Sequence, residues 1–235
     1  ELHYELVTTQ QQLDAWLAKL RTAELGSFDT ETTSLDPMRA RLVGLSFSVK
    51  AGEACYIPVG HDYPGAPQQL DLDETLRALQ PILEDPKRPK LGQHAKYDCN
   101  VLSNYGIEVR GIAFDTMLES YVLNATANRH DMDTLAKRWL DHDTLHYEDV
   151  AGKGAKQISF SQVDLDTACR YSAEDADVTL RLHHALWPKL QVQPSLEEVF
   201  TSIEMPLVPV LARMEQRGVL VDIAALRGQS KELGK

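Results

Sequence analysis

The sequence predicts an α/β fold in which α-helices flank a mixed β-sheet. Two patterns support this prediction. Short segments rich in β-branched and aromatic residues are interspersed with longer segments whose apolar residues recur every three or four positions, as they do in amphipathic helices. The first short segments follow one another with only turns between them, which indicates adjacent and mostly antiparallel strands, whereas the later ones alternate with helices.

The individual elements are predicted in chain order. Residues 13–23 have helical apolar spacing and lead into a short apolar strand that ends in Asp29-Thr30-Glu31. Two further strands cover residues 41–49 and 54–60, with a turn between them. The remaining predicted elements are a helix at 73–85, a short strand at 89–93, a helix at 95–106, a short strand at 111–114, and helices at 115–124, 132–140 and 165–190.

Two segments are less regular. Residues 150–160 contain glycine and lysine and are predicted to form a loop, either beside a functional site or as a plain connector. Residues 202–222 contain two prolines in an apolar run and are interpreted as a hinge into another helix, outside the first core. The predicted organisation is therefore a domain at 1–190, followed by a linker and the first helix of a further domain at 191–235.

Length and composition limit the classes of protein to which the chain can belong. A chain of 235 residues with 43% hydrophobic content can bury one substantial core, and it contains no run of about 18 apolar residues. The three cysteines lack C-x-x-C spacing, so we expect neither a disulfide framework nor a thiolate zinc site, but a soluble protein of a reducing cytoplasm. Because the chain begins with Glu and ends in a helix-compatible segment, we expect it to be part of a longer protein.

Charge and histidine spacing narrow the choice further. The net charge of −11 argues against broad electrostatic attachment to nucleic acid, because clustered lysines and arginines normally neutralise phosphates. Any contact with nucleic acid should therefore be local and assisted by metal ions. His142 and His146 are four residues apart, and His183 adjoins His184, but no H-E-x-x-H pattern is present. Histidines on solvated helix faces are a better interpretation than zinc chemistry.

Asp29 and Glu31 are the first candidates for catalytic chemistry. They lie two residues apart at the end of an apolar strand, so both carboxylates point to the same face of the sheet. The D-x-[D/E] pattern occurs six times in the chain, and most occurrences are expected to be solvated charges or helix caps. The apolar Leu25 and Phe28 distinguish this pair, because carboxylates at the end of a buried strand need a metal ion or another cation as partner.

Two other segments supply further candidates. Tyr171 and Asp175 are four residues apart in a predicted helix and therefore share one face, where a phenol and a carboxylate can meet one ligand. The alternatives are a packing role for Tyr171 and a functional role for Asp177. Asp98 lies in the first turns of a predicted helix, where compensation of the helix dipole is the alternative to a role in the site.

These residues occur in the order D-x-E, D and Y-x-x-x-D, and with this order the sequence resembles the exonuclease domain of bacterial DNA polymerase I, of polymerase family A. The segments that carry the resemblance are FDTETTSLD at 28–36, LGQHAKYD at 91–98, GIAFDTMLESYVLN at 111–124, RHDMDTLAKRWL at 129–140, AGKG at 151–154 and RYSAEDADVTL at 170–180. The resemblance implies a ribonuclease H-like fold and the tyrosine subclass of the DEDD exonucleases. The tail at 203–219 resembles the entry into a polymerase domain of the same parent chain.

The resemblance also implies roles for individual residues. Asp29, Glu31 and Asp175 would hold one divalent metal ion, Mg²⁺ or Mn²⁺, and Asp29 with Asp98 would serve a second, while Tyr171 would orient the attacking water. Contacts with the end of the nucleic-acid strand are implied for Thr32, Leu35, Gln93, His94, Tyr97 and Met117, and stacking on a base is implied for Tyr147. His94 departs from the family pattern, which usually has asparagine there.

The implied function is proofreading by a monomer in the bacterial cytoplasm: removal of mismatched nucleotides, as deoxynucleoside monophosphates, from the single-stranded 3′ end of DNA. Two alternatives stay open. An RNA-processing exonuclease of the RNase D type shares the acidic set and the tyrosine, but the matches at 111–140 and the polymerase-like tail count against it. A non-catalytic support module, which binds single strands or packs against a polymerase, is disfavoured by the retained acids.

Overall fold

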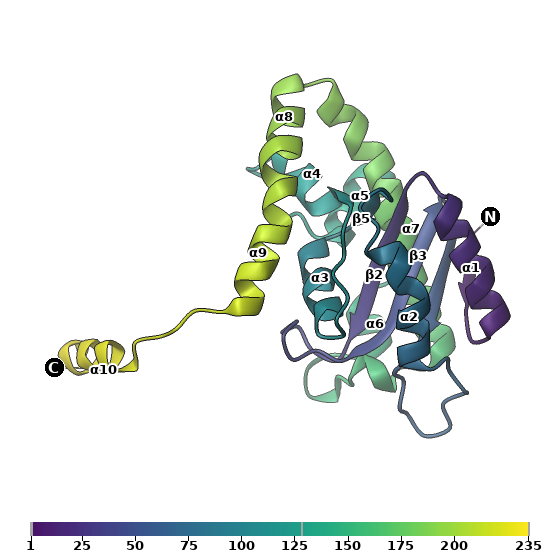
Figure 1. Ribbon diagram of the computed structural model, residues 1–235, viewed down its shortest axis with the longest axis horizontal. Coiled ribbons are helices and arrows are strands. Elements are labelled where there is room, and N and C mark those ends of the chain that lie inside the picture. The colour runs from purple at the N-terminus through teal and green to yellow at the C-terminus, as the bar shows by residue number, and fades with distance from the viewer. Residues whose placement is uncertain (1, 128, 235) are drawn as a thin grey trace.

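A single mixed sheet forms the centre of the computed structural model, which describes residues 2–127 and 129–234 (Figure 1). Its strands are β1 (His3–Leu6), β2 (Gly26–Thr32), β3 (Leu42–Lys50), β4 (Glu53–Pro58), β5 (Lys90–Gly92) and β6 (Ile112–Asp115), in the spatial order β1-β4-β3-β2-β5-β6. β3 runs antiparallel to β2 and β4, and the other neighbouring strands pair in parallel. The predicted mixed sheet is confirmed. Among these strands only β1 was not predicted, because its four residues are too few to show a period.

Helices cover both faces of this sheet. α1 (Gln10–Thr22) and α2 (Leu72–Leu83) pack on one face, where Trp16 and Leu79 join Phe28 and Phe47 in the largest apolar cluster. The long helix α7 (Leu165–Gln191) runs along the other face (Figure 1). The remaining helices are α3 (Ala95–Ser103), α4 (Thr116–Leu123), α5 (Met132–Leu140), α6 (Tyr147–Ala151), α8 (Pro194–Val199), α9 (Met205–Arg217) and α10 (Ile223–Leu233).

Small residues allow α7 to lie close to the sheet. The face of β2 and β3 that meets α7 carries three buried serines and a glycine, namely Ser27, Gly44, Ser46 and Ser48, and the facing side of α7 carries Ala168, Ser172, Ala173 and Ala176. The Ser27 hydroxyl donates a hydrogen bond of 2.7 Å to the backbone carbonyl of Ala176. Because side-chain volume sets the distance between packed elements, this pairing brings the middle of α7 next to the end of β2.

The C-terminal helices differ from the sequence-based expectation. The segment 202–222 was expected to lie outside the first core, but Met205 and Val208 are buried with Phe200 and Leu190 in a cluster beside β6 and α4. Pro206 lies in the first turn of α9 and Pro209 lies inside the helix, so the helical backbone continues across both prolines. A π-helical turn at Phe200–Glu204 precedes it. α10 and the residues before it are exposed and lie away from the sheet (Figure 1).

None of the described helices combines the length and the apolar character that a membrane-spanning segment requires.

Several helices begin at an aspartate whose side chain accepts a backbone N–H of the first turn. Asp71 caps α2, Asp131 caps α5 and Asp164 caps α7. Three of the D-x-[D/E] pairs are thereby accounted for as helix caps, as the sequence predicts.

Gly44 gives the first testable prediction. A Cβ atom added at this position of β3 would lie 2.3 Å from the Tyr56 ring, which is fully buried and hydrogen-bonded through its hydroxyl to His61. Gly44→Ala should therefore lower the free energy of unfolding by about 1–3 kcal/mol, the usual cost of overpacking a core. Urea denaturation measures this change. Gly228→Ala in α10, where an added Cβ meets nothing within 4 Å, is the matched control and should leave the urea midpoint of the domain unchanged. Equal stability of both variants would contradict the tight packing of Tyr56 on β3.

Candidate active site

An acid-lined cleft opens where β2 ends. Its volume is about 540 Å³, and it is lined by Asp29, Thr30, Glu31, Thr32, Thr33, Ser34, Leu35, Gln93, His94, Tyr97, Asp98, Tyr147, Gln157, Ile158, Ser159, Tyr171 and Asp175. These residues come from β2 and the loop after it, from α3 and the two residues before it, from α6 and α7, and from the segment before α7. The cleft therefore unites the three acidic motifs that are far apart in the sequence. A second hollow, of about 550 Å³ between α3 and α9, contains none of these acids.

Three carboxylates form the centre of the cleft. Ligand oxygens of Asp29, Glu31 and Asp175 all lie within 4.8 Å of one another. Asp29 and Glu31 share the face of β2 that meets α7, as strand alternation predicts, and the Ser172 hydroxyl donates a 2.7 Å hydrogen bond to Glu31. The pairing of β2 with β3 shifts register between Glu31 and the next residue. Such irregularities re-aim side chains at the ends of strands.

Asp98, in the first turn of α3, approaches the same strand end beyond the last residue of β2 that pairs with β5. It is 2% exposed, and its Oδ1 accepts hydrogen bonds from the backbone N–H of Thr30 at 3.1 Å and from the Thr30 hydroxyl at 2.5 Å. Asp98 is not among the three mutually close carboxylates, but it lines the same cleft. Thr30 thus ties Asp98 to the end of β2.

The first turn of α3 is itself fixed by a buried carboxylate. Asp115, at the end of β6, accepts the backbone N–H groups of His94 at 3.2 Å and Ala95 at 2.8 Å, and those of Met117 and Leu118 at the start of α4. His94 has a left-handed backbone with φ of 61°. Asp115 therefore aligns the starts of α3 and α4 and, through α3, sets the position of Asp98.

The described residues supply no cationic side chain that pairs with the acids of the cleft. Among residues 2–127 and 129–234, no lysine, arginine or histidine forms an ion pair with Asp29, Glu31, Asp98 or Asp175. Burial raises the pKa of Asp29 to about 6, and burial together with the Asp29 charge raises the pKa of Glu31 to about 8. The pKa values of Asp98 and Asp175 are raised by the same two causes. A divalent cation is the partner that this arrangement lacks.

Aromatic residues form one wall of the cleft. Tyr171 lies one helical turn before Asp175, and burial followed by the Asp175 charge raises the pKa of its phenol, so the hydroxyl keeps its proton. The Tyr147 ring stacks on Phe160 at a centroid distance of 6.2 Å and meets Tyr171 edge-on, also at 6.2 Å. Tyr147 is 37% exposed, so part of its ring is free to contact a ligand.

Most of the residues that were predicted to contact the end of the nucleic-acid strand line the cleft. Thr32, Leu35, Gln93, His94, Tyr97 and Tyr147 line the cleft, whereas Met117 does not. Leu35 is 96% exposed at the rim. The side-chain amide of Gln93 is already engaged, because it donates to the carbonyl of His130 and accepts from the Thr116 hydroxyl. Gln93 therefore supports the wall of the cleft in this structure.

Several residues of the site were missed by sequence reasoning. Thr30 and Ser172 hydrogen-bond to the acids, and Asp115 orders α3. For Thr30 and Ser172, the only signal in the sequence was their place inside the acidic motifs, since a hydroxyl next to a carboxylate has no distinctive spacing. The segment 150–160 lies beside the site, because Gln157, Ile158 and Ser159 line the cleft.

The residues that were considered as alternatives to this acidic site have structural partners outside the cleft. Asp177 is fully buried and accepts the Tyr4 hydroxyl at 2.9 Å and the backbone N–H of Gly52 at 2.6 Å, so it ties α7 to β1 and to the β3–β4 turn. The interpretation of all histidines as solvated was wrong for His183. This residue is 5% exposed, and its Nδ1 lies 2.6 Å from Glu119, because the faces of α4 and α7 that carry them pack together.

Comparison with known proteins places the chain in a family. A family model described as 3′-5′ exonuclease matches residues 4–191, and DNA polymerase I of Pseudomonas aeruginosa is 61% identical over 237 aligned residues that cover the whole chain. The chain belongs to the 3′-5′ exonuclease domain family of DNA polymerase I. This exonuclease domain spans about a quarter of that relative's length, 26%.

Solved structures support the assignment of the fold. The POL domain of Pol1 from M. smegmatis, in complex with DNA primer-template and dNTP, superimposes with a TM-score of 0.77 at 23% identity. The match covers 98% of this chain and 35% of the M. smegmatis chain. Brucella melitensis NrnC with bound Mg²⁺ superimposes with a TM-score of 0.57 at 21% identity. This match covers 86% of this chain and 90% of the NrnC chain. At these identities the likeness concerns the fold alone, and it confirms the predicted ribonuclease H-like architecture of the exonuclease domain.

The raised pKa of Glu31 predicts a pH-dependent stability of the metal-free exonuclease domain. The carboxyl has a pKa of about 8 in the folded chain, against an ordinary value of 4.5. Its contribution to folding stability is therefore fully present below pH 4.5 and is lost as the pH rises through about 8. In EDTA, the melting temperature of the unaltered chain should fall relative to that of Glu31→Gln between pH 5 and pH 8.

Glu232→Gln, in the exposed helix α10, is the matched control for this measurement and should follow the unaltered chain at every pH. A constant difference between Glu31→Gln and the unaltered chain across the range would contradict the raised pKa.

Proposed function

We propose that the chain removes nucleotides one at a time from the 3′ end of single-stranded DNA by metal-dependent hydrolysis, as the proofreading part of a DNA polymerase I. The observation that carries this proposal is the cluster of Asp29, Glu31 and Asp175, which has no cationic partner in the described part of the chain and lies in an open cleft of an exonuclease-family domain. Buried carboxylates of this kind are costly unless a cation binds them.

The donor set fits divalent metal ions. Asp29, Glu31 and Asp175 would hold one Mg²⁺ or Mn²⁺, and Asp29 with Asp98 a second, since oxygen ligands suit both ions. When bound, such ions activate water and neutralise charge that develops on a phosphate and its leaving oxygen. Metal binding would release the proton that a pKa of about 8 keeps on Glu31 at neutral pH. The similarly folded Brucella melitensis NrnC has been solved with bound Mg²⁺, which is consistent with this assignment.

The residues of the chain would position the reactants. The protonated Tyr171 hydroxyl can donate a hydrogen bond and, with Glu31, orient the attacking water toward the terminal phosphodiester. Tyr147 and Leu35 present exposed apolar surface to the cleft, where unstacked bases of a frayed end can pack. Thr32, His94 and Tyr97 line the same cleft. Hydrolysis would release a deoxynucleoside 5′-monophosphate, and mismatched ends would be preferred because they fray more easily.

The organisation proposed with this function follows the relatives. The exonuclease domain would occupy residues 1–190, with α8 and α9 docked on it, and residues 191–235 would lead into a polymerase domain of the same parent chain. A monomer in the bacterial cytoplasm is proposed. The 61% identity with a DNA polymerase I favours this proposal over an RNase D-type activity on RNA, and the uncompensated acids favour it over a non-catalytic support module.

Cleavage of matched oligonucleotides tests the proposed function. With Mg²⁺, the chain should shorten a 5′-labelled single-stranded DNA stepwise from its 3′ end, and EDTA should stop this. Asp175→Asn should abolish cleavage and most of the stabilisation by Mn²⁺, which mass action sets at about 2.7 kcal/mol of unfolding free energy for the unaltered chain at a hundredfold excess over Kd. In EDTA the variant should be at least as stable as the unaltered chain, because one repelling charge is gone. Faster cleavage of a matched RNA would contradict the DNA assignment, and a chain without any Mn²⁺ effect would favour the support role.

Tyr171→Phe separates orientation of the water from strand binding. The substitution removes the hydroxyl and keeps the ring against Tyr147 and Phe160, so kcat should fall at least tenfold while KM for single-stranded DNA stays within about threefold, since a positioned hydrogen bond acts on the reaction step. Steady-state cleavage rates give both constants. Tyr105→Phe, which removes the hydroxyl that accepts the backbone N–H of Leu42 away from the cleft, is the matched control for hydroxyl loss and should leave kcat unchanged. An undiminished kcat in Tyr171→Phe would remove the phenol from the mechanism.

A further inference from the structure

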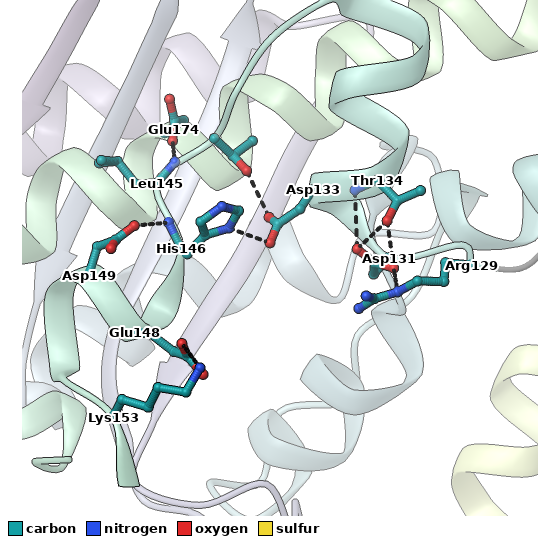
Figure 2. Close-up of polar contacts among 11 residues, drawn as sticks. Arg129, Asp131, Asp133, Thr134, Leu145, His146, Glu148, Asp149, Lys153 and Glu174 are labelled. Carbon is teal, nitrogen blue, oxygen red and sulfur yellow. Dashed lines mark hydrogen bonds and ion pairs between the residues drawn. The ribbon is translucent and has the colours of Figure 1, made fainter. Parts of the chain in front are cut away.

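Two carboxylates from two different helices hold the segment that leads into α6. Residues 142–146 belong to neither a helix nor a strand, yet they bring Tyr147 to the wall of the active-site cleft. Figure 2 shows the side chains that hold this segment, Glu174 from α7 and Asp133 from α5. Neither has a part in the metal-dependent chemistry described above.

Glu174 holds the segment from the helix that carries Asp175. It is 7% exposed, its Oε2 accepts the backbone N–H of Leu145 at 2.7 Å, and its Oε1 lies 2.9 Å from Nε2 of His142. Successive residues of an α-helix point about 100° apart. One turn of α7 therefore directs Asp175 into the cleft and Glu174 onto the segment before Tyr147.

Asp133 holds the same segment from α5. Its Oδ1 accepts the Thr144 hydroxyl at 2.8 Å, and its Oδ2 lies 2.8 Å from Nδ1 of His146 (Figure 2). The backbone N–H of His146 donates to Asp149 in the first turn of α6, at 3.2 Å. The two carboxylates thus fix the side chains and the backbone immediately before Tyr147.

We infer that Glu174 and Asp133 are positioning residues that set the place of the Tyr147 ring relative to the metal-binding acids, and thereby the affinity for a single-stranded DNA end. The inference rests on the proposed function, in which Tyr147 packs against a base. Because Glu174 and Asp175 are consecutive in one helix, the aromatic wall and the acid cluster share a rigid support. The Tyr147 ring itself contacts Phe160 and Tyr171, whereas the two carboxylates hold the backbone that leads to it.

Equilibrium binding of a fluorescein-labelled single-stranded oligodeoxynucleotide in EDTA tests the inference without hydrolysis. Glu174→Ala and Tyr147→Ala should each weaken binding by roughly 5- to 100-fold, the range expected when one base-stacking platform is lost. If Glu174 acts through Tyr147, the double variant should bind no more weakly than Tyr147→Ala, within about twofold, because coupled residues are not additive. Effects that multiply in the double variant, or unchanged binding in Glu174→Ala, would overturn the inference.

Three matched variants separate positioning from loss of structure. Glu174→Gln should bind within about threefold of the unaltered chain, because its amide oxygen accepts the Leu145 N–H and its amide nitrogen can donate to His142. Asp133→Ala, which removes the carboxylate on α5, should weaken binding of the oligodeoxynucleotide as Glu174→Ala does. This variant keeps the test decisive if Glu174→Ala does not fold. Asp143→Ala, an exposed acid of the same region that pairs only with Lys137 among the described residues, should change nothing. Weakened binding in Asp143→Ala, or normal binding in Asp133→Ala, would contradict the assignment.

The metal site provides an independent readout. The Mn²⁺-induced rise in melting temperature should be the same in Asp133→Ala and in the unaltered chain, since this carboxylate lies on α5 and acts on the aromatic wall. A reduced rise in Asp133→Ala would show that Asp133 supports the metal site and would overturn the inference. A chain that shows the expected binding pattern but does not hydrolyse DNA with Mg²⁺ would contradict the proposed function and leave the positioning roles intact.

Discussion

The convergence of four acids at the end of β2 without a cation is the constraint on which the rest of the site depends. Like charges at such distances repel, and burial strengthens the repulsion because little water screens it. The polypeptide must therefore hold the acids in place with other interactions. Small residues draw α7 onto β2, Asp115 fixes the start of α3, and Thr30 and Ser172 hydrogen-bond to individual carboxylates. The apolar cluster around Trp16 and Phe28 supplies the stability that offsets this repulsion.

Much of this arrangement could be predicted from local periodicity. The two-residue spacing of Asp29 and Glu31 and the four-residue spacing of Tyr171 and Asp175 each place a pair of side chains on one face, because strand and helix periods are fixed by backbone geometry. Asp98 alone carried no such signal. Its place follows from the pairing of β5 with β2 and from the start of α3, and both are long-range features, so only the resemblance to a family brought it into the predicted set.

Other features could not be read from the sequence, for physical reasons. Met117 falls in a matching segment, but its helix position directs it away from the cleft. The prolines at 206 and 209 suggested a break, yet α9 continues across both of them after a π-helical turn, and the buried side chains of Met205 and Val208 hold it against the core. His183 and Glu119 occupy apolar faces of two helices, and only the packing of α4 on α7 reveals that they meet. Tertiary contact decides each of these cases.

The left-handed backbone at His94 has a consequence for how this position can vary. Its φ of 61° directs its own N–H and that of Ala95 to Asp115. The contacts that order this turn are therefore made by the main chain and not by the His94 side chain. Histidine, asparagine and glycine tolerate this conformation, whereas β-branched residues do not. An asparagine at this position, which the resemblance to the family implies, would preserve the same turn at the start of α3. The main chain of residue 94 thus orders α3, whichever of these side chains faces the cleft.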